Sequence, residues 1–232
     1  MKRFWTSATV AEVAGGFGVR LDDRPLNTPA KRPAIVPARA VALAMAAEWD
    51  AVGETVDPLT MPVTRAVNVT LDRVIAARAE VASAIAAYGA NDLLCYRAEH
   101  PAALVARQTA AWDPLLAWAE STYGATLAVT AGVMHLDQPA EGLVRLTSAV
   151  EGIDAWGLTP LHELVTLSGS LVIGLAVREG AVDAEAAWAA SCVDEAWNIE
   201  QWGEDAEAAE QAARRRRAFL DASRLLELLA GG

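Results

Sequence analysis

The hydrophobic pattern of this chain changes its period about one third of the way along, and this change limits the folds it can adopt. Apolar residues alternate in TVAEV and at Phe17, Val19 and Leu21, on either side of AGG, which predicts short antiparallel strands joined by hairpins. Later segments follow the helical period instead, with candidate helices at residues 101–122, 140–151, 158–178, 184–202 and 206–229. Strands followed by helices are typical of an α+β chain.

We therefore predict an α+β fold, with a small β-rich N-terminal part of antiparallel strands and hairpins and a larger, mostly α-helical C-terminal part. The N-terminal part also contains helices, one of which should run from Ala38 to about Val52 after Pro37. The segment RAEHP separates the two patterns. We place a domain boundary there, which gives residues 1–97 and residues 98–232 as the two domains.

Composition narrows the class of protein. The chain has 232 residues, of which 53% are hydrophobic, so it can bury a sizeable core and disorder is excluded. Its formal net charge of -11 argues against nucleic acid or an anionic membrane as partner, because both select basic surfaces. The two cysteines, Cys95 and Cys192, lie far apart without a CxxC motif, which fits a reducing compartment rather than a disulfide scaffold or a zinc site.

Neither a targeting segment nor a membrane span is predicted. The N-terminal stretch MKRFWTSATVAEV has no continuous apolar segment, so we expect no signal peptide and a cytoplasmic protein. The most apolar segment, Leu164 to Val177, is too short to cross a bilayer and reads as a buried core helix. Membrane insertion is therefore not expected.

The residues also carry no recognisable catalytic signature. His100, His135 and His162 are the only histidines, and no two of them have a metal-ligand spacing. LSGSL lacks the glycines of a nucleophile elbow and is interpreted as close packing within a buried helix, while AGGFGVR lacks the spacing of a dinucleotide loop. No Walker motif occurs. We expect no catalytic residue, no cofactor and no metal; the run from Arg214 to Arg217 is interpreted as a solvated face, with Glu210 paired to Arg214.

The stretch SCVDEAWNIEQWGED is unusual because tryptophans and carboxylates share one short helix. Asp183 as N-cap and Gly203 as C-terminal stop predict a helix from about residue 184 to residue 202. At about 100° per residue, one apolar stripe contains Trp188, Cys192, Ile199 and Trp202. Glu195 falls inside this stripe, Asp194 lies at its edge and Trp197 points the opposite way. A carboxylate on an apolar face needs a partner.

Several motifs occur together in a fixed order. They are FGVRLDDRPLNTPAKRPAIVP, AAEWD, DLLCYRAEHPAALVARQTAAWDPLLAWAESTYG and WNIEQWG. In combination they resemble the assembly chaperones of the F1 part of ATP synthase, specifically the member that escorts the alpha subunit in mitochondria and related bacteria. The resemblance extends from Phe4 to about Leu226.

This resemblance implies a chaperone and not an enzyme. Such a protein binds the unassembled F1 alpha subunit, shields the apolar surface later buried against the beta subunit, and releases the alpha subunit into the hexamer without hydrolysing ATP. We expect it to be a monomer when free and, because no targeting segment is predicted, a bacterial cytoplasmic member of this family.

The resemblance also implies partner-binding residues. An acidic group, an aromatic and xIxxWG correspond here to Asp194, Glu195, Trp197, Ile199, Trp202 and Gly203. Either carboxylate could meet a basic group on the alpha subunit, and Glu195 could instead pair with an arginine of its own fold. Trp49 of AAEWD is a further candidate, although its place beside Met45 and Val52 on one helix side favours core packing.

Two other classes of function stay open at this stage. The chain could be a small-metabolite enzyme that uses a carboxylate pair such as Asp194 with Glu200, or a permanent subunit of a larger complex. An enzyme needs a concave pocket with convergent polar groups, whereas a chaperone needs an exposed apolar patch.

Overall fold

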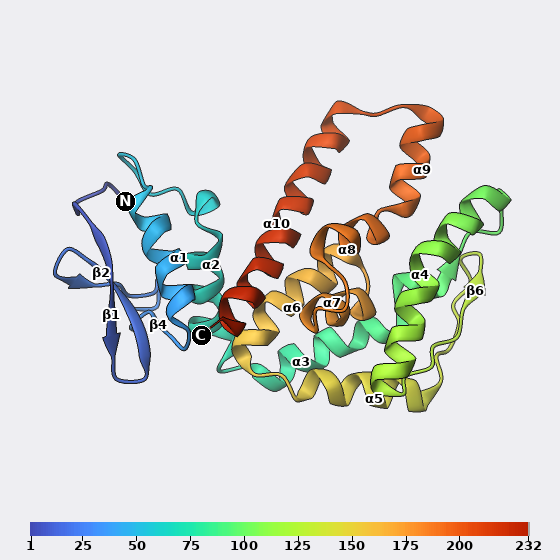
Figure 1. The fold of residues 1–232 in the computed structure, drawn as a ribbon, viewed down its shortest axis with the longest axis horizontal. Coiled ribbons are helices and arrows are strands. Elements are labelled where there is room, and N and C mark those ends of the chain that lie inside the picture. Colours follow the sequence, from blue (N-terminus) through green and yellow to red (C-terminus); the bar gives the residue numbers. More distant parts are fainter. Residues whose placement is uncertain (232) are drawn as a thin grey trace. The chain divides into compact units, whose positions relative to one another are not determined.

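The computed structural model describes residues 1–231, and the backbone divides into two compact units (Figure 1). The first, which we call the β unit, comprises Met1–Arg78, Ala155–Pro160 and the residues from Arg224 on. The second, the helical unit, comprises Ala79–Asp154 and Leu161–Ser223. The predicted α+β class is confirmed, with a small antiparallel sheet followed by a mostly helical part. The first break between these units in the chain follows Arg78, whereas the sequence predicted a domain boundary between residues 97 and 98. That boundary stays a prediction.

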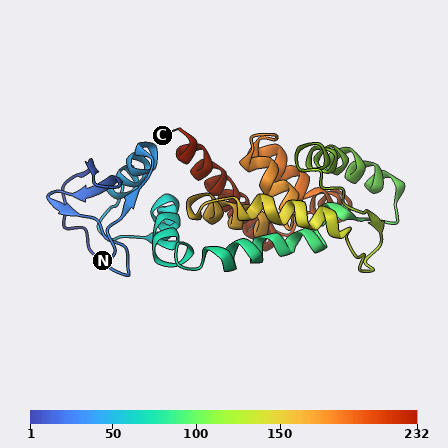
Figure 2. The same cartoon turned by 90° about the horizontal axis from the view of Figure 1, so that it is seen from below.

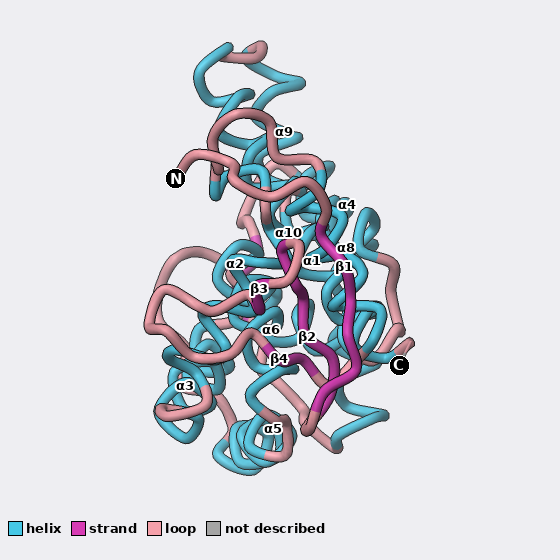
Figure 3. The backbone as a smooth tube through the Cα atoms, turned by 90° about the vertical axis from the view of Figure 1, so that its left-hand side faces the viewer, coloured by secondary structure: helices cyan, strands magenta, loops and turns pink. Residues whose placement is uncertain are grey.

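The β unit begins with four strands, which are β1 (Ala8–Val13), β2 (Gly16–Leu21), β3 (Arg24–Pro25) and β4 (Ile35–Val36). Strand β2 pairs antiparallel with each of the other three (Figure 3). Its register with β1 runs from Ala8 opposite Leu21 to Val13 opposite Gly16, so the predicted AGG turn joins a hairpin. Val19 and Leu21 are buried and Arg20 between them is exposed, as the alternation predicted.

One glycine of the hairpin turn permits a close approach of the backbone. Gly16 has a φ of 142°, and a Cβ atom added there would lie 2.3 Å from the carbonyl oxygen of Val36 in β4. Gly15 has a φ of 92° but no atom within 4 Å of such a Cβ. Only Gly16 is therefore required by sterics as well as by backbone conformation.

The helices of the β unit cover its sheet. They are α1 (Arg39–Asp50), the short 3₁₀ turn η1 (Pro58–Thr60), α2 (Pro62–Val69) and the π-helical η2 (Thr70–Val74). In Figure 1, α1 lies between the sheet and α2. Its buried side carries Val41, Met45 and Trp49, which pack into one core with Trp5 and Met61.

The helical unit consists mainly of α-helices. Its elements in chain order are α3 (Arg78–Ala86), η3 (Ala87–Asn91), η4 (Leu93–Cys95), β5 (Tyr96–Arg97), α4 (Ala102–Tyr123), β6 (Thr130–Ala131), α5 (Ala140–Glu151), α6 (Ala155–Ser168), α7 (Leu171–Arg178), α8 (Ala184–Ser191), α9 (Val193–Trp202) and α10 (Ala206–Ala230). Helices α3, α6 and α10 contribute residues to both units. Every residue of α7 from Leu171 to Val177 is buried, and α5 runs beside the α3–η3 segment in Figures 1 and 2.

Two predicted helices are each broken into two. The segment 158–178 ends α6 at Ser168; Gly169 then takes a φ of 73°, and the Ser170 hydroxyl accepts a hydrogen bond from Ile173 N at 3.0 Å, which caps α7. LSGSL therefore forms a helix break and not the interior of one buried helix. The segment 184–202 breaks at Cys192, whose φ of -108° and ψ of 17° end α8 and begin α9. No helix among residues 1–231 is both long and apolar enough to cross a membrane.

The two turn glycines give a test of the hairpin geometry. We expect Gly15→Ala to cost about 1 kcal/mol, because only the backbone conformation opposes it. Gly16→Ala should cost more, about 2 to 3 kcal/mol, because its Cβ also meets the Val36 carbonyl. Urea denaturation of both variants measures the difference. Equal losses of unfolding free energy would show that β4 does not hold its position against β2.

Candidate functional site

Helix α9 contains most of the predicted partner-binding residues, and none of its side chains is buried. Ile199 is 45% exposed and Trp202 is 86% exposed. Trp188 on α8 is buried instead, with its ring 5.5 Å from that of Phe219. The predicted apolar stripe from Trp188 to Trp202 is therefore wrong as one continuous buried face, because the break at Cys192 separates its two halves.

Asp194 attaches α9 to α4. Its Oδ1 accepts a hydrogen bond from Gln108 Nε2 at 2.7 Å. Gln108 is only 1% exposed, and its Oε1 accepts a second hydrogen bond from Ala98 N at 2.8 Å. Because a buried amide needs partners at both ends, Asp194 completes a structural contact.

Arg107 of α4 holds the same face of α9 through two further contacts. Its Nη1 lies 2.7 Å from Glu200 Oε1, and its Cζ lies 4.8 Å from the centre of the Trp197 ring. The hydrogen bond from Arg107 holds the pKa of Glu200 below its usual value. Trp197 is thus half-buried against an arginine of its own fold.

Glu195 lies on the opposite face of α9, toward α10. Its Oε1 is 3.0 Å from Arg215 Nη1, so the alternative of an internal arginine partner is what the structure contains. Arg215 also donates to the Leu167 carbonyl at 3.3 Å and lies 5.5 Å from the Trp188 ring centre. The Glu195 side chain is still 49% exposed, so its carboxylate remains open to solvent.

A hollow of about 370 Å³, which we call the α9–α10 cleft, lies between Glu195 and the start of α10. It is lined by Glu195, Asn198, Ile199, Glu204, Asp205, Ala208, Ala209, Gln211, Ala212 and Arg215. The Asp205 carboxylate caps α10 by accepting from Ala208 N at 2.8 Å, whereas Glu204 makes no hydrogen bond or ion pair with any of residues 1–231. Trp202 follows Glu195 by seven residues and shares its helix face. The cleft therefore combines carboxylates with small apolar side chains.

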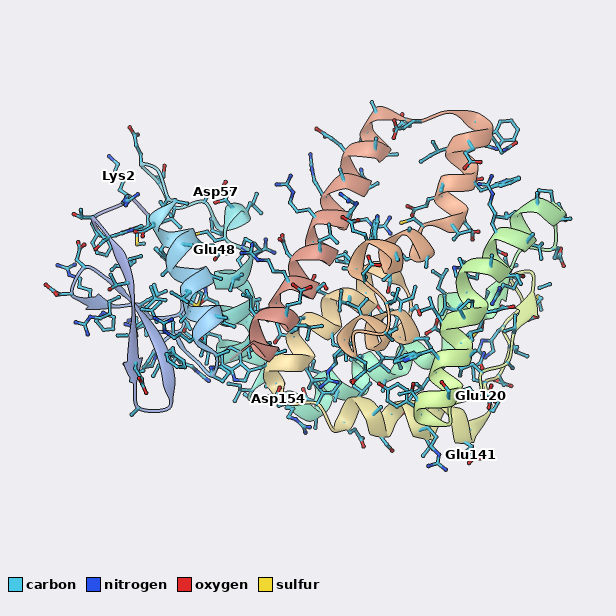
Figure 4. The ribbon with its side chains drawn as sticks, in the orientation of Figure 1. Lys2, Glu48, Asp57, Glu120, Glu141 and Asp154 are labelled. Atoms are coloured by element: carbon cyan, nitrogen blue, oxygen red, sulfur yellow. The ribbon has the colours of Figure 1, made fainter. Side chains whose placement is uncertain are left out.

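Trp49, the remaining predicted residue, is far from this site in the chain and is buried in the core of the β unit. Its ring is 5.1 Å from that of Trp5, and Trp5 Nε1 donates to its carbonyl at 3.1 Å. The neighbouring acids of AAEWD are also structural. Glu48, labelled in Figure 4, accepts from Val63 N at 2.7 Å and Thr64 N at 2.8 Å at the start of α2, and Asp50 accepts from Ala8 N. A role for Trp49 in partner binding stays a prediction.

Sequence reasoning missed the residues that hold α9. Arg107 and Gln108 belong to the quoted motif ARQTAAW, but nothing local indicates their partners. Arg215 was interpreted only as part of a solvated run. That interpretation is confirmed for Arg214, which pairs with Glu210 at 3.0 Å, while Arg216 pairs with Glu185 on α8.

The geometry gives little support to the metabolite-enzyme alternative. Asp194 and Glu200 contact different partners on α4, and neither lines the α9–α10 cleft. Within residues 1–231, no cluster of His, Cys, Asp and Glu could hold a metal ion. The arrangement is suited to binding a surface that is partly basic and partly apolar.

Comparison with known proteins identifies the class. Residues 2–120 match the family described as ATP12 chaperone protein. The crystal structure of Atp12 from Paracoccus denitrificans is 46% identical, with 98% of each chain covered and a TM-score of 0.95. A crystal structure from Agrobacterium tumefaciens is 44% identical and covers 98% of this chain and 86% of that one, with a TM-score of 0.94.

These matches define a chaperone, as the sequence resemblance predicted. The chain belongs to the ATP12 chaperone family, and its role is that of a chaperone in F1-ATPase assembly.

Trp49 can be tested as a core residue. We expect Trp49→Ala to lower the unfolding free energy by about 3 to 5 kcal/mol, because it removes a large buried side chain and leaves a cavity. Thermal melting and urea denaturation measure this loss. A variant that melts like the wild type but no longer binds a partner would instead establish Trp49 as an interface residue.

Because polar contacts hold α9 in place, we predict that the stability of this helix against local opening depends on salt and pH. Hydrogen exchange at constant pH should show less protection of residues 193–202 at high salt than at low salt, because the ion pairs of Glu200 with Arg107 and of Glu195 with Arg215 are exposed and are screened by salt. Residues 171–177 of α7 serve as the buried control. The folded pKa of Glu200 lies below its unfolded value, so its pair with Arg107 contributes above the unfolded pKa and is lost as the pH falls through the folded pKa. If the protection of α9 changes neither with salt nor with pH, this account is contradicted.

Proposed function

We propose that this protein binds the unassembled alpha subunit of F1, shields the apolar surface that later contacts the beta subunit, and releases the alpha subunit into the hexamer without hydrolysing ATP. The proposal is supported by membership of the ATP12 family together with the exposed, acidic and apolar α9–α10 cleft. In this proposal the protein is a cytoplasmic monomer when it is not bound to the alpha subunit.

Glu195 is the carboxylate that we assign to the partner. Asp194 is already engaged by the buried Gln108 amide, and its loss would leave that amide without an acceptor. Glu195 is half-exposed, faces the cleft, and is paired with an arginine that a basic group of the partner can replace. Asp194 then acts as a positioning residue that keeps α9 in place.

Two exposed apolar side chains, in or beside the cleft, add apolar surface to its acidic groups. Ile199 lines the cleft, and Trp202 extends from the same helix face with most of its surface open to solvent. Large aromatic residues contribute strongly to binding when an interface excludes water from them. In this proposal they cover apolar area of the alpha subunit, while Trp197 supports α9 from behind through Arg107.

Size-exclusion chromatography with separately purified alpha and beta subunits tests the function. We expect a complex with alpha and none with beta. Glu195→Lys and Trp202→Ala should each lose the alpha complex while melting like the wild type, because both side chains are exposed. Glu141→Lys is the matched control, since Glu141 is an exposed acid on α5, on another side of the helical unit in Figure 4. Absence of any complex with wild-type protein would refute the proposal.

A charge reversal separates the two roles that Glu195 can have. Combining Glu195→Arg with Arg215→Glu restores an internal ion pair but reverses the charge offered to the partner. We expect the double variant, like Glu195→Lys, to melt as the wild type does and still to fail to bind the alpha subunit. Recovery of binding would show that Glu195 acts only through Arg215. For Asp194, the Asn variant should bind and the Lys variant should not, because only Asn keeps an acceptor for Gln108.

A further inference from the structure

A second hollow in the helical unit is lined only by apolar residues. It lies between α4 and α8, has a volume of about 570 Å³, and is separate from the α9–α10 cleft. Leu115 and Trp118 of α4 line it together with Ala186 and Ala189 of α8, and Val182 and Val193 also belong to its lining. We call it the α4–α8 groove. Its volume is within the range of about 300 to 1,000 Å³ typical of ligand sites.

The residues of the groove explain why it is open and ordered. Alanines on α8 leave space that larger side chains would fill, and both Ala186 and Ala189 are exposed. The half-buried ring of Trp118 is held at 5.5 Å by an edge contact with Tyr123. Pro114, which also lines the groove, has no N–H, so the Ala110 carbonyl one turn earlier receives no helical hydrogen bond from it. The groove thus offers an aromatic wall held by a ring contact.

The charged residues next in sequence to those that line the groove are all acidic. The charged residues adjacent in sequence to a lining residue are Asp113, Asp183, Glu185 and Asp194, and no Lys or Arg is adjacent to any lining residue. Asp113 and Glu185 have arginine partners, yet their side chains remain 57% and 55% exposed. Such acidic neighbours favour an occupant with basic flanks. A second copy of this chain, with a net charge of -11, fits poorly.

Helix α9 connects the groove to the proposed binding site. Val193, its first residue, lines the groove, and Glu195, two residues later, lines the α9–α10 cleft. We propose that the α4–α8 groove binds an apolar segment flanked by lysine or arginine, supplied by the same client protein that occupies the cleft. This inference rests on the proposed function for the source of the segment, and on the groove itself for its chemistry.

Filling the groove tests the inference. Ala186→Phe and Ala189→Phe place a ring in the groove without burying new polar atoms, and Ala117→Phe is the control because Ala117 is exposed on α4 outside it. Melting should not change in any variant. We expect both groove variants to bind the alpha subunit about tenfold more weakly, as for loss of one strong interface contact, and the control to bind normally. Normal binding by the groove variants overturns the inference and leaves the proposed function intact.

A peptide probe tests the groove independently of the alpha subunit. Fluorescence anisotropy compares one labelled leucine-rich peptide with lysines at both ends and a second with glutamates there. We expect the wild type to prefer the lysine-flanked peptide and Ala186→Phe to lose that binding. Equal binding of the two peptides, or binding that Ala186→Phe does not reduce, overturns the inference. Light scattering that shows a dimer, dissociated by the same substitution, assigns the groove to a second copy and overturns it too.

Discussion

The hydrogen bond between the buried amide of Gln108 and the carboxylate of Asp194 is the contact on which the candidate site depends. Helix α9 has no buried side chain, so apolar packing cannot fix its position. The Gln108 side chain is itself held by Ala98 N and is almost completely buried, which makes it a rigid point of attachment. Arg107 adds a contact along the same face. These polar contacts set the orientation in which Glu195 faces α10, and hence the chemistry of the cleft.

Stability and binding are carried by different parts of the helical unit. Helix α7 is buried along nearly its whole length and supplies the core, whereas α9 contributes exposed side chains and polar contacts. Elements with few buried apolar contacts open at low free-energy cost, and binding regions are drawn from such elements. Because α9 borders both the α9–α10 cleft and the α4–α8 groove, a small movement of this helix changes both hollows at once.

Local patterns in the sequence predicted the fold better than the site. The alternation around AGG gave the β1–β2 hairpin, and periodicity gave α4 and α5. The breaks at Gly169 and Cys192 were missed because small residues suit a packed helix interior as well as a helix end. A helical wheel shows which side chains share a face but not whether another element covers it. The contacts of Glu200 with Arg107 and of Asp194 with Gln108 join residues 93 and 86 positions apart, which no local pattern reveals.

The acidic character of the chain bears on how it can expose apolar surface at all. An exposed tryptophan beside small apolar side chains is a liability for self-association, since identical patches can bury each other. Here the apolar area of the cleft is accompanied by Glu195 and Glu204, and that of the groove by Asp183 and Glu185. The net charge of -11 adds repulsion between two copies that meet through either surface, which opposes dimerisation. In the proposed function a basic client would meet the same carboxylates favourably, so one arrangement of charge would both oppose self-association and favour the client.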